Sequence, residues 1–145
     1  MIEITEVFPF DKPILREIYL AGRIKTFHWV PADSFQLDDF DKHTKGEHIL
    51  VARYNGAIAG FISMWLQENF LHHLYVSNEL QHRGIGTALL GAGCRLATSA
   101  IQLKCLEKNV NAIAFYKKHG FKEKGTGTSK DGDFILFERK NMQSK

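Results

Sequence analysis

One segment of the sequence, around Gly84 and Gly86, carries residue types and spacing that could bind a phosphate group. An apolar strand ending near Val76 leads through a short loop into these glycines, and a helix follows them. Glycine lets the backbone approach a ligand closely, and the first turn of a helix presents unpaired N–H groups to an anion. Arg83 adds a cation beside them. The segment is typical of a pyrophosphate cradle, although a tight strand-to-helix turn would need the same glycines.

The spacing argues against the two commonest nucleotide-binding motifs. A dinucleotide site would need a third glycine at position 89, which is Leu89. A Walker loop would need Gly-Lys followed by Ser or Thr, and the sequence contains no such tripeptide. A pyrophosphate bound here would therefore belong to another kind of ligand.

A second segment, residues 109–121, reads Asn-Val-Asn-Ala-Ile-Ala-Phe-Tyr-Lys-Lys-His-Gly-Phe. Taken with the glycine loop, in this order and at this separation, it resembles the GNAT family of N-acetyltransferases over roughly residues 48–139. The first family motif, Gln/Arg-x-x-Gly-x-Gly/Ala, is matched by Gln81, Gly84 and Gly86. The second is matched by Asn109, Ala112, Phe115, Tyr116, Gly120 and Phe121. Asn78 departs from the pattern, because many members carry proline there.

The resemblance implies an α+β fold, with a mixed, mostly antiparallel sheet flanked by helices and a splayed pair of strands over 70–76 and 101–106. It implies acetyl-CoA as cosubstrate in the cleft between those strands. The main chain of the first strand would pair with the pantetheine arm and steady the developing oxyanion. The residues that the resemblance assigns to cosubstrate binding are Leu74, Tyr75, Val76, Gln81, His82, Arg83, Gly84, Ile85, Gly86, Thr87, Asn109, Ala112 and Phe115.

Tyr116 is the candidate general acid. The resemblance places its phenol beside the thioester sulfur, where it could protonate the departing thiolate. Its residue type and helical position alone would favour packing against Phe115 and Phe121, since aromatic residues on helices usually belong to the core. The family match favours the proton donor and leaves the packing role to Phe115.

A base is also needed, because an alkyl ammonium ion cannot attack a thioester. His72 lies on the strand that lines the predicted cleft, and histidine accepts protons near neutral pH. Regular alternation would place His72 on the face of Leu74 and Val76, with His73 on the opposite face. A hydrogen-bonded core histidine is the alternative. Weaker candidates for the base are Glu68, His28 and Glu107. No metal site is predicted, because neighbouring strand residues diverge and no suitably spaced cysteine or carboxylate supports one.

Periodic patterns predict the elements that position these groups. Strands are expected over 2–7, 48–54, 57–66, 70–76, 101–106, 121–124 and 134–139, and helices over 11–25, 37–44, 86–98 and 112–119. Asp11 is expected to cap the first helix, Asn55-Gly56 to form a type I′ turn and Gly120 to end the last helix. A polar loop should join the last two strands. Four aromatic residues without a clear period, Phe27, His28, Trp29 and Phe35, either line the acceptor pocket or fill the core.

The composition fits one domain over residues 1–140 with a loose tail over 141–145. The 145 residues are 44% apolar and 24% charged, and a net charge of +3 is too small to indicate nucleic acid. No signal peptide or membrane segment is visible, so a cytoplasmic protein without a membrane partner is expected. Cys94 and Cys105 fit buried free thiols. A homodimer is compatible with these patterns.

The predicted function is an N-acetyltransferase that moves an acetyl group from acetyl-CoA to a primary amine by direct attack. A second enzymatic possibility is transfer of another acyl group, or transfer to a protein N-terminus or a lysine. A non-catalytic acyl-CoA sensor is the rival outside enzymes. Tyr116 argues against the sensor, because binding alone needs no proton donor at the sulfur.

Overall fold

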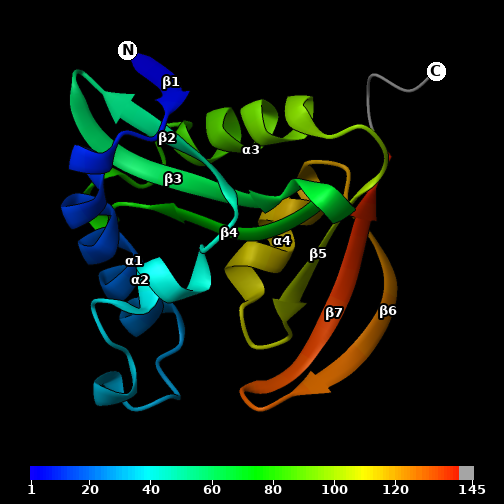
Figure 1. The fold of residues 1–145 in the computed structure, drawn as a ribbon. Helices are drawn as coiled ribbons and strands as arrows, with labels where there is room; N and C mark the ends of the chain where they lie inside the picture. Colours follow the sequence, from blue (N-terminus) through cyan, green and yellow to red (C-terminus); the bar gives the residue numbers. More distant parts are fainter. Residues whose placement is uncertain (141–145) are drawn as a thin grey trace.

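A computed structural model describes residues 1–140, which form one seven-stranded sheet with helices on both faces (Figure 1). The predicted tail over 141–145 lies outside the described residues. The strands are β1 (Ile2–Glu6), β2 (His48–Tyr54), β3 (Ala57–Trp65), β4 (Phe70–Val76), β5 (Ile101–Leu106), β6 (Lys122–Ser129) and β7 (Gly132–Arg139). They lie in the order β1-β2-β3-β4-β5-β7-β6, and every neighbouring pair is antiparallel except β4 and β5. The expected α+β fold is confirmed.

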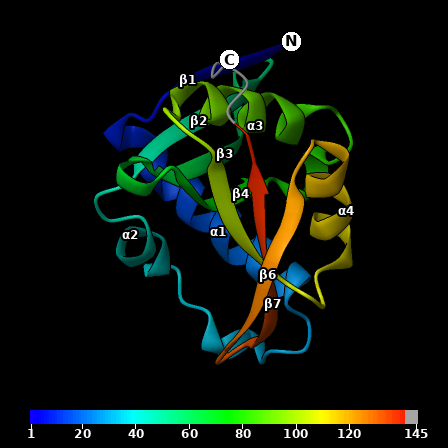
Figure 2. The same cartoon turned by 90° about the vertical axis from the view of Figure 1, so that its right-hand side faces the viewer.

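The helices bury a separate apolar cluster on each face of the sheet. They are α1 (Lys12–Thr26), α2 (Asp39–His43), α3 (Ile85–Leu96) and α4 (Val110–Lys118). Alternation along β3 supplies both clusters, because Phe61 packs with α1 and α2 while Ile62 packs with α3 and α4. Helices α2 and α4 consequently lie on opposite sides of the ribbon formed by β6 and β7 (Figure 2).

Local turn chemistry fixes the hairpin between β2 and β3 and the end of α4. Asn55 and Gly56 both have positive φ angles, 52° and 87°, as a type I′ turn requires. Gly120 has a φ of 90°, and the Phe121 N–H returns to the carbonyl of Tyr116 over 3.0 Å. This bond closes the helix end in a Schellman arrangement. Both predictions from the sequence are confirmed.

Asp11 precedes α1 as predicted, but its side chain makes no hydrogen bond to the helix. The carboxylate turns back to accept the Phe8 N–H at 2.9 Å and two N–H groups of Arg53 at 2.9 and 3.2 Å. Asp11 is fully buried. Its role is therefore to tie the start of α1 to β2, and the predicted cap is wrong.

The predicted polar loop between the last two strands is wrong as well. Strand β6 continues through Ser129, and a tight turn at Lys130 and Asp131 joins it to β7. Nearly all of β6 is exposed, so burial imposed no apolar alternation by which a strand could be recognised. Gly127 fits against the ring of Phe134, where an added Cβ would collide with it.

Two irregularities of β4 shape the centre of the molecule. Strand β4 pairs with β5 only at Phe70 and Gln102, so the two strands separate beyond that point, as the resemblance implied. On its other edge, β4 carries a bulge, because Ser63 pairs with His73 and the next β3 residue, Met64, pairs with Leu71. His72 is the extra residue.

Candidate active site

The loop between β4 and α3 presents a row of free main-chain donors. His82 and Gly84 both adopt left-handed φ angles, 64° and 82°. The N–H of Ala88 donates to the Gly84 carbonyl, whereas the N–H groups of Ile85, Gly86 and Thr87 have no acceptor within residues 1–140. An Ala-sized side chain at Gly84 would meet nothing within 4 Å, so space remains beside these donors. Free amides, the positive end of a helix and open space fit a pyrophosphate.

Neighbouring elements support this cradle from several sides. A Cβ at Gly86 would lie 3.6 Å from the Phe115 ring and 3.8 Å from the Val76 side chain, so α3, α4 and β4 meet there. Thr87 and His119 are within hydrogen-bond distance, 3.3 Å between Oγ1 and Nε2. The cation of Arg83 lies over the ring of Tyr54, 5.5 Å from its centroid. His119 and Tyr54 were not predicted to contribute here.

The separation of β4 from β5 leaves the edge of β4 without a partner strand beyond Phe70. Main-chain N–H and C=O groups that face β5 along this edge are available to an extended ligand, as in strand addition. The edge ends where the Gln81 side chain donates to the Val76 carbonyl at 2.9 Å. Gln81 therefore holds the loop in place through the main chain, and its amide nitrogen is already engaged.

Tyr116 is buried on the inner side of α4, against the rings of Phe115 and Phe121 at 5.3 and 5.5 Å. Burial raises the pKa of Tyr116 far above its usual range, with further contributions from Cys105 and Cys94. The phenol consequently keeps its proton at neutral pH. Its hydroxyl makes no hydrogen bond to any other residue in the described part of the chain.

Tyr75 is a second tyrosine, partly buried, and it lies on β4. Burial raises the pKa of Tyr75, and the nearby hydroxyl of Tyr19 raises it further, as do Tyr116 and Cys105. Both cysteines are free and buried, as predicted.

The bulge in β4 changes which residues surround His72. Its Nδ1 contacts the carboxylate of Glu47, which also accepts the hydroxyl of Ser63. Leu74 and Val76 pack instead in the cluster under α3 and α4. The predicted shared face with Leu74 and Val76 is therefore wrong, because the extra residue shifts the alternation by one. Sequence reasoning missed Glu47, which lies 25 residues before His72.

The electrostatics of this contact favour one tautomer of His72. Burial would raise the pKa of Glu47, but the hydrogen bonds from His72 and Ser63 hold it below its ordinary value. An ionised carboxylate at Nδ1 keeps the ring proton there and leaves the Nε2 lone pair free. The His72 side chain is 40% exposed and that of Glu47 only 3%, so the accessible partner is the imidazole.

His73 lies on the same side of the sheet as His72, which corrects the expectation that the two diverge. One ligand atom each from Glu47, His72 and His73 lie within 4.8 Å of one another. Burial lowers the pKa of His73 to about 4, so its ring is neutral at physiological pH. The ring packs edge-on against Tyr19 at 5.2 Å. The ring of His43 stacks on that of His73, with 6.4 Å between the ring centroids.

The aromatic residues of the segment between α1 and α2 gather beside the turn that joins β6 and β7. Phe27 contacts the rings of Trp29 and Phe35 at 5.5 and 6.4 Å. The indole N–H of Trp29 donates to the carbonyl of Asp131 at 3.4 Å, and the ammonium of Lys108 lies 5.3 Å from its ring. These residues are partly exposed, which leaves them available to a ligand.

The buried side chain of Arg23 packs against the aromatic residues of this region. Its guanidinium lies 4.0 Å from the Tyr19 ring and 4.8 Å from the Phe35 ring, and it pairs with Asp39 at 3.1 Å. Its Nε is the one buried side-chain nitrogen or oxygen in residues 1–140 without a hydrogen-bond partner. The cation was not anticipated from the sequence, because its burial depends on the short helix α2 returning Asp39 to α1.

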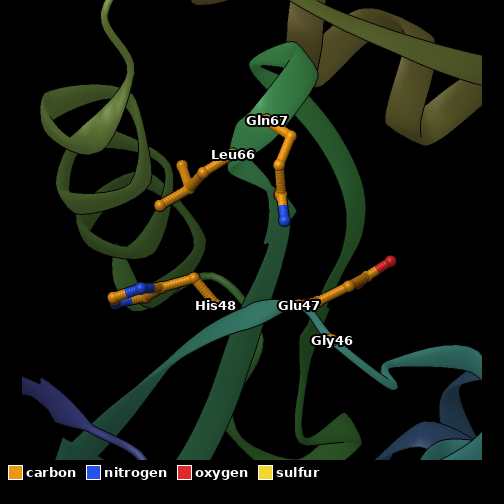
Figure 3. A pocket seen from close by; sticks show the side chains of 5 residues that line it. All are labelled: Gly46, Glu47, His48, Leu66 and Gln67. Atoms are coloured by element: carbon orange, nitrogen blue, oxygen red, sulfur yellow. The ribbon is translucent and has the colours of Figure 1, made fainter.

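A pocket of about 430 Å³ opens at the start of β2 and the end of β3 (Figure 3). Its lining consists of Gly46, Glu47, His48, Leu66 and Gln67. Figure 3 shows Glu47 and His48 extending to opposite sides of β2, with His48 on the side of α3. The pocket includes no residue predicted to bind the cosubstrate, and Glu47 alone relates it to the contact with His72.

The other predicted residues occupy less direct positions. Asn109 is the N-cap of α4, and its Oδ1 accepts the Ala112 N–H at 3.3 Å. None of the weaker candidates for the base, Glu68, His28 and Glu107, makes a hydrogen bond to Glu47 or His72 within residues 1–140. No helix within residues 1–140 is both long and apolar enough to span a membrane.

A comparison with protein families matches residues 13–121 to the acetyltransferase (GNAT) family. Solved structures with the same fold include a GCN5-related N-acetyltransferase from Rhodopseudomonas palustris, 19% identical, with a TM-score of 0.79 over 95% of this chain and 94% of the other.

Two similar structures contain a ligand. The PaiA N-acetyltransferase from Thermoplasma acidophilum, in complex with coenzyme A, is 22% identical, with a TM-score of 0.77 over 97% of this chain and 99% of its own. YncA from Salmonella typhimurium, with its cofactor acetyl-CoA, is 18% identical, with a TM-score of 0.72 over 98% and 95% of the two chains. At these identities the likeness establishes the fold.

Proposed function

The chain belongs to the acetyltransferase (GNAT) family, and from this we propose that it transfers the acetyl group of acetyl-CoA directly to a primary amine. The proposal rests on three features of β4 and the elements that follow it. The loop after β4 offers free amides, the edge of β4 has no partner strand beyond Phe70, and the buried phenol of Tyr116 on α4 keeps its proton. Two similar proteins, PaiA and YncA, have structures with coenzyme A and acetyl-CoA.

The residues of the loop would hold the cosubstrate by its anionic end. The N–H groups of Ile85, Gly86 and Thr87 have no acceptor within residues 1–140, so at the positive end of α3 they would donate to the pyrophosphate. The edge of β4 would orient the pantetheine arm, and a main-chain N–H in Leu74 to Val76 would stabilise negative charge developing on the carbonyl oxygen. Acetyl-CoA supplies the acetyl group as a thioester.

Two side chains would move the protons. His72 would remove a proton from the amine at Nε2, directly or through a water molecule, because Glu47 holds the ring with its other nitrogen protonated. Tyr116 would donate its hydroxyl proton to the thiolate sulfur as it departs. The aromatic residues between α1 and α2 and the turn at Asp131 would form the acceptor side.

Replacing Tyr116 with Phe tests the proposal, because it removes one hydroxyl and keeps the ring that packs against Phe121. We expect kcat to fall by roughly 10²- to 10⁴-fold, toward the lower end because a thiolate leaves fairly well unaided. Loss in kcat and in kcat/KM together would mark an interaction made only in the transition state. Thiol release across a panel of amines measures turnover.

Acetyl-CoA affinity, measured by calorimetry, is the control, and it should barely change in Tyr116→Phe. Turnover within about twofold of the parent would assign proton donation to another group. If the parent binds acetyl-CoA and acetylates nothing in the panel, the protein is a sensor and the proposed transferase activity is wrong.

A further inference from the structure

The contact between Glu47, His72 and His73 has the composition of a metal centre. It joins two imidazoles and one carboxylate, whose ligand atoms lie within 4.8 Å of one another. Two histidines and one carboxylate, with an open fourth position, form a common set of ligands for zinc and related cations. Calcium and magnesium prefer an all-oxygen set, which this cluster does not offer.

The surroundings prepare these side chains for a cation. The His73 ring packs against the rings of Tyr19 at 5.2 Å and His43 at 6.4 Å, which fixes its orientation. The hydroxyl of Ser63 donates to the Glu47 carboxylate and orients it, as outer contacts of metal ligands usually do.

Access and charge are also suitable. The His72 side chain is 40% exposed, so a hydrated ion can reach the cluster from solvent. The Glu47 carboxylate is almost fully buried, with 3% of its side chain exposed, and its hydrogen-bond partners are the His72 imidazole and the Ser63 hydroxyl. The cation of Arg23 is engaged with Asp39. A dication entering here would meet one negative charge and no cationic contact of Glu47.

We propose that Glu47, His72 and His73 bind a divalent transition-metal cation of the zinc class, and that its binding inhibits the enzyme. The metal would separate Nδ1 of His72 from Glu47 and take the lone pair at Nδ1, while the proton from Nδ1 moves to Nε2. No proton is gained or lost overall. An imidazole with a protonated Nε2 has no lone pair there, so it cannot accept a proton from the amine. This inhibition rests on the proposed function of His72, whereas metal binding does not.

Metal binding is tested without turnover. Zinc chloride is titrated into EDTA-treated, dialysed protein in a calorimeter, and cobalt chloride is added to a second sample to record the visible absorption of bound cobalt. We expect one equivalent per chain. His73→Gln and Glu47→Gln should each weaken binding by about 10- to 100-fold. His48→Gln is the matched control, because His48 adjoins Glu47 in sequence and extends to the other side of β2 (Figure 3).

Absence of saturable binding would overturn the site, and so would equal losses in His48→Gln and His73→Gln. Inhibition is then measured as the ratio of turnover in zinc to turnover in EDTA, each variant against itself. We expect roughly 10²-fold inhibition of the parent at saturating zinc, the loss expected when a general base is blocked. Binding with unchanged turnover would reject inhibition and keep the site. If no amine is acetylated in EDTA, the proposed function fails while the calorimetry still decides the metal.

Discussion

Glu47 and His72 meet across three strands of the sheet. Glu47 lies just before β2, and its carboxylate contacts His72 on β4 and accepts the hydroxyl of Ser63 on β3. The contact spans 25 residues and is formed only when β2, β3 and β4 pair, so a lone acidic residue gives no spacing signal for it. Tyr116 and Gly84, by contrast, lie on the elements predicted for them, because local motifs fix their positions relative to the helices.

Glu47 gives the first prediction at this scale. Glu47→Gln keeps the shape of the side chain and removes its charge, so His72 loses the partner that fixes its tautomer. We expect kcat to fall by roughly 10- to 10²-fold, because the base remains and only its orientation is lost. Steady-state kinetics with acetyl-CoA and the best amine measure the change.

Glu6→Gln is a matched control, because Glu6 pairs with His48 at 2.9 Å. Glu6 belongs to β1, at the far edge of the sheet from β5. This variant should retain the parent kcat. An equal fall in both variants would point to a general loss of charge or stability and would remove Glu47 from the mechanism.

The predicted bounds of helices and strands are most accurate where burial imposes a regular pattern of apolar residues. The bounds of β2, β4 and β5 agree with the predicted ranges, because buried strands carry runs of apolar residues. The predicted β6 is too short because the strand is almost entirely exposed, and the predicted α2 is too long because Phe40 is its one buried residue. The bulge at His72 has no sequence signature here, so the faces of its neighbours could not be assigned correctly.

The start of α3 gives a prediction at the scale of elements. Gly86→Val should abolish the rise in melting temperature that acetyl-CoA produces. Its Cβ would already lie 3.6 Å from Phe115, so its methyl groups would occupy the space through which the pyrophosphate approaches. A ligand that binds only the native state stabilises it by mass action, so loss of binding removes the shift. Thermal unfolding with acetyl-CoA, NAD and ATP at equal concentration measures this, and only acetyl-CoA should stabilise the parent.

Gly91→Val serves as the control on the same helix. A Cβ at Gly91 meets only the end of the Arg95 side chain, at 3.6 Å. The variant should keep the shift whatever its own melting temperature. Equal stabilisation of the parent by NAD would contradict acetyl-CoA as the cosubstrate.

At the scale of the whole molecule, two apolar clusters on opposite faces of one sheet depend on the same strands. The buried pair of Asp11 and Arg53 links the start of α1 to β2 and therefore fastens one layer to the sheet. The sequence indicated the layers but not this link. A charge pair between segments that are distant in the sequence produces no periodic pattern from which it could be predicted.

This pair gives a prediction for stability against pH. Burial would raise the pKa of Asp11, but the bonds from Arg53 and the Phe8 N–H hold it below the ordinary 3.8. The stabilisation is present above the pKa of the unfolded chain and is lost as pH falls through the folded value. The free energy of unfolding should therefore decline more steeply below about pH 4 in the parent than in Asp11→Ala.

Asp11→Ala should itself cost about 3 kcal/mol at neutral pH, because it leaves Arg53 unpaired and mostly buried. Urea unfolding from pH 3 to 7 measures both quantities. Parallel pH curves for parent and variant would show that Asp11 titrates normally.

The bulge in β4 also bears on how this chemistry could be gained or lost in evolution. His72 is the one residue of β4 that opposes no residue of β3. Removing it would leave Leu71 and His73 facing the same two β3 residues, Met64 and Ser63, that they face now. An in-frame deletion of a single codon would thus erase the imidazole while preserving the sheet, and the reverse insertion would create it. The proposed base is therefore an addition to a strand that is complete without it.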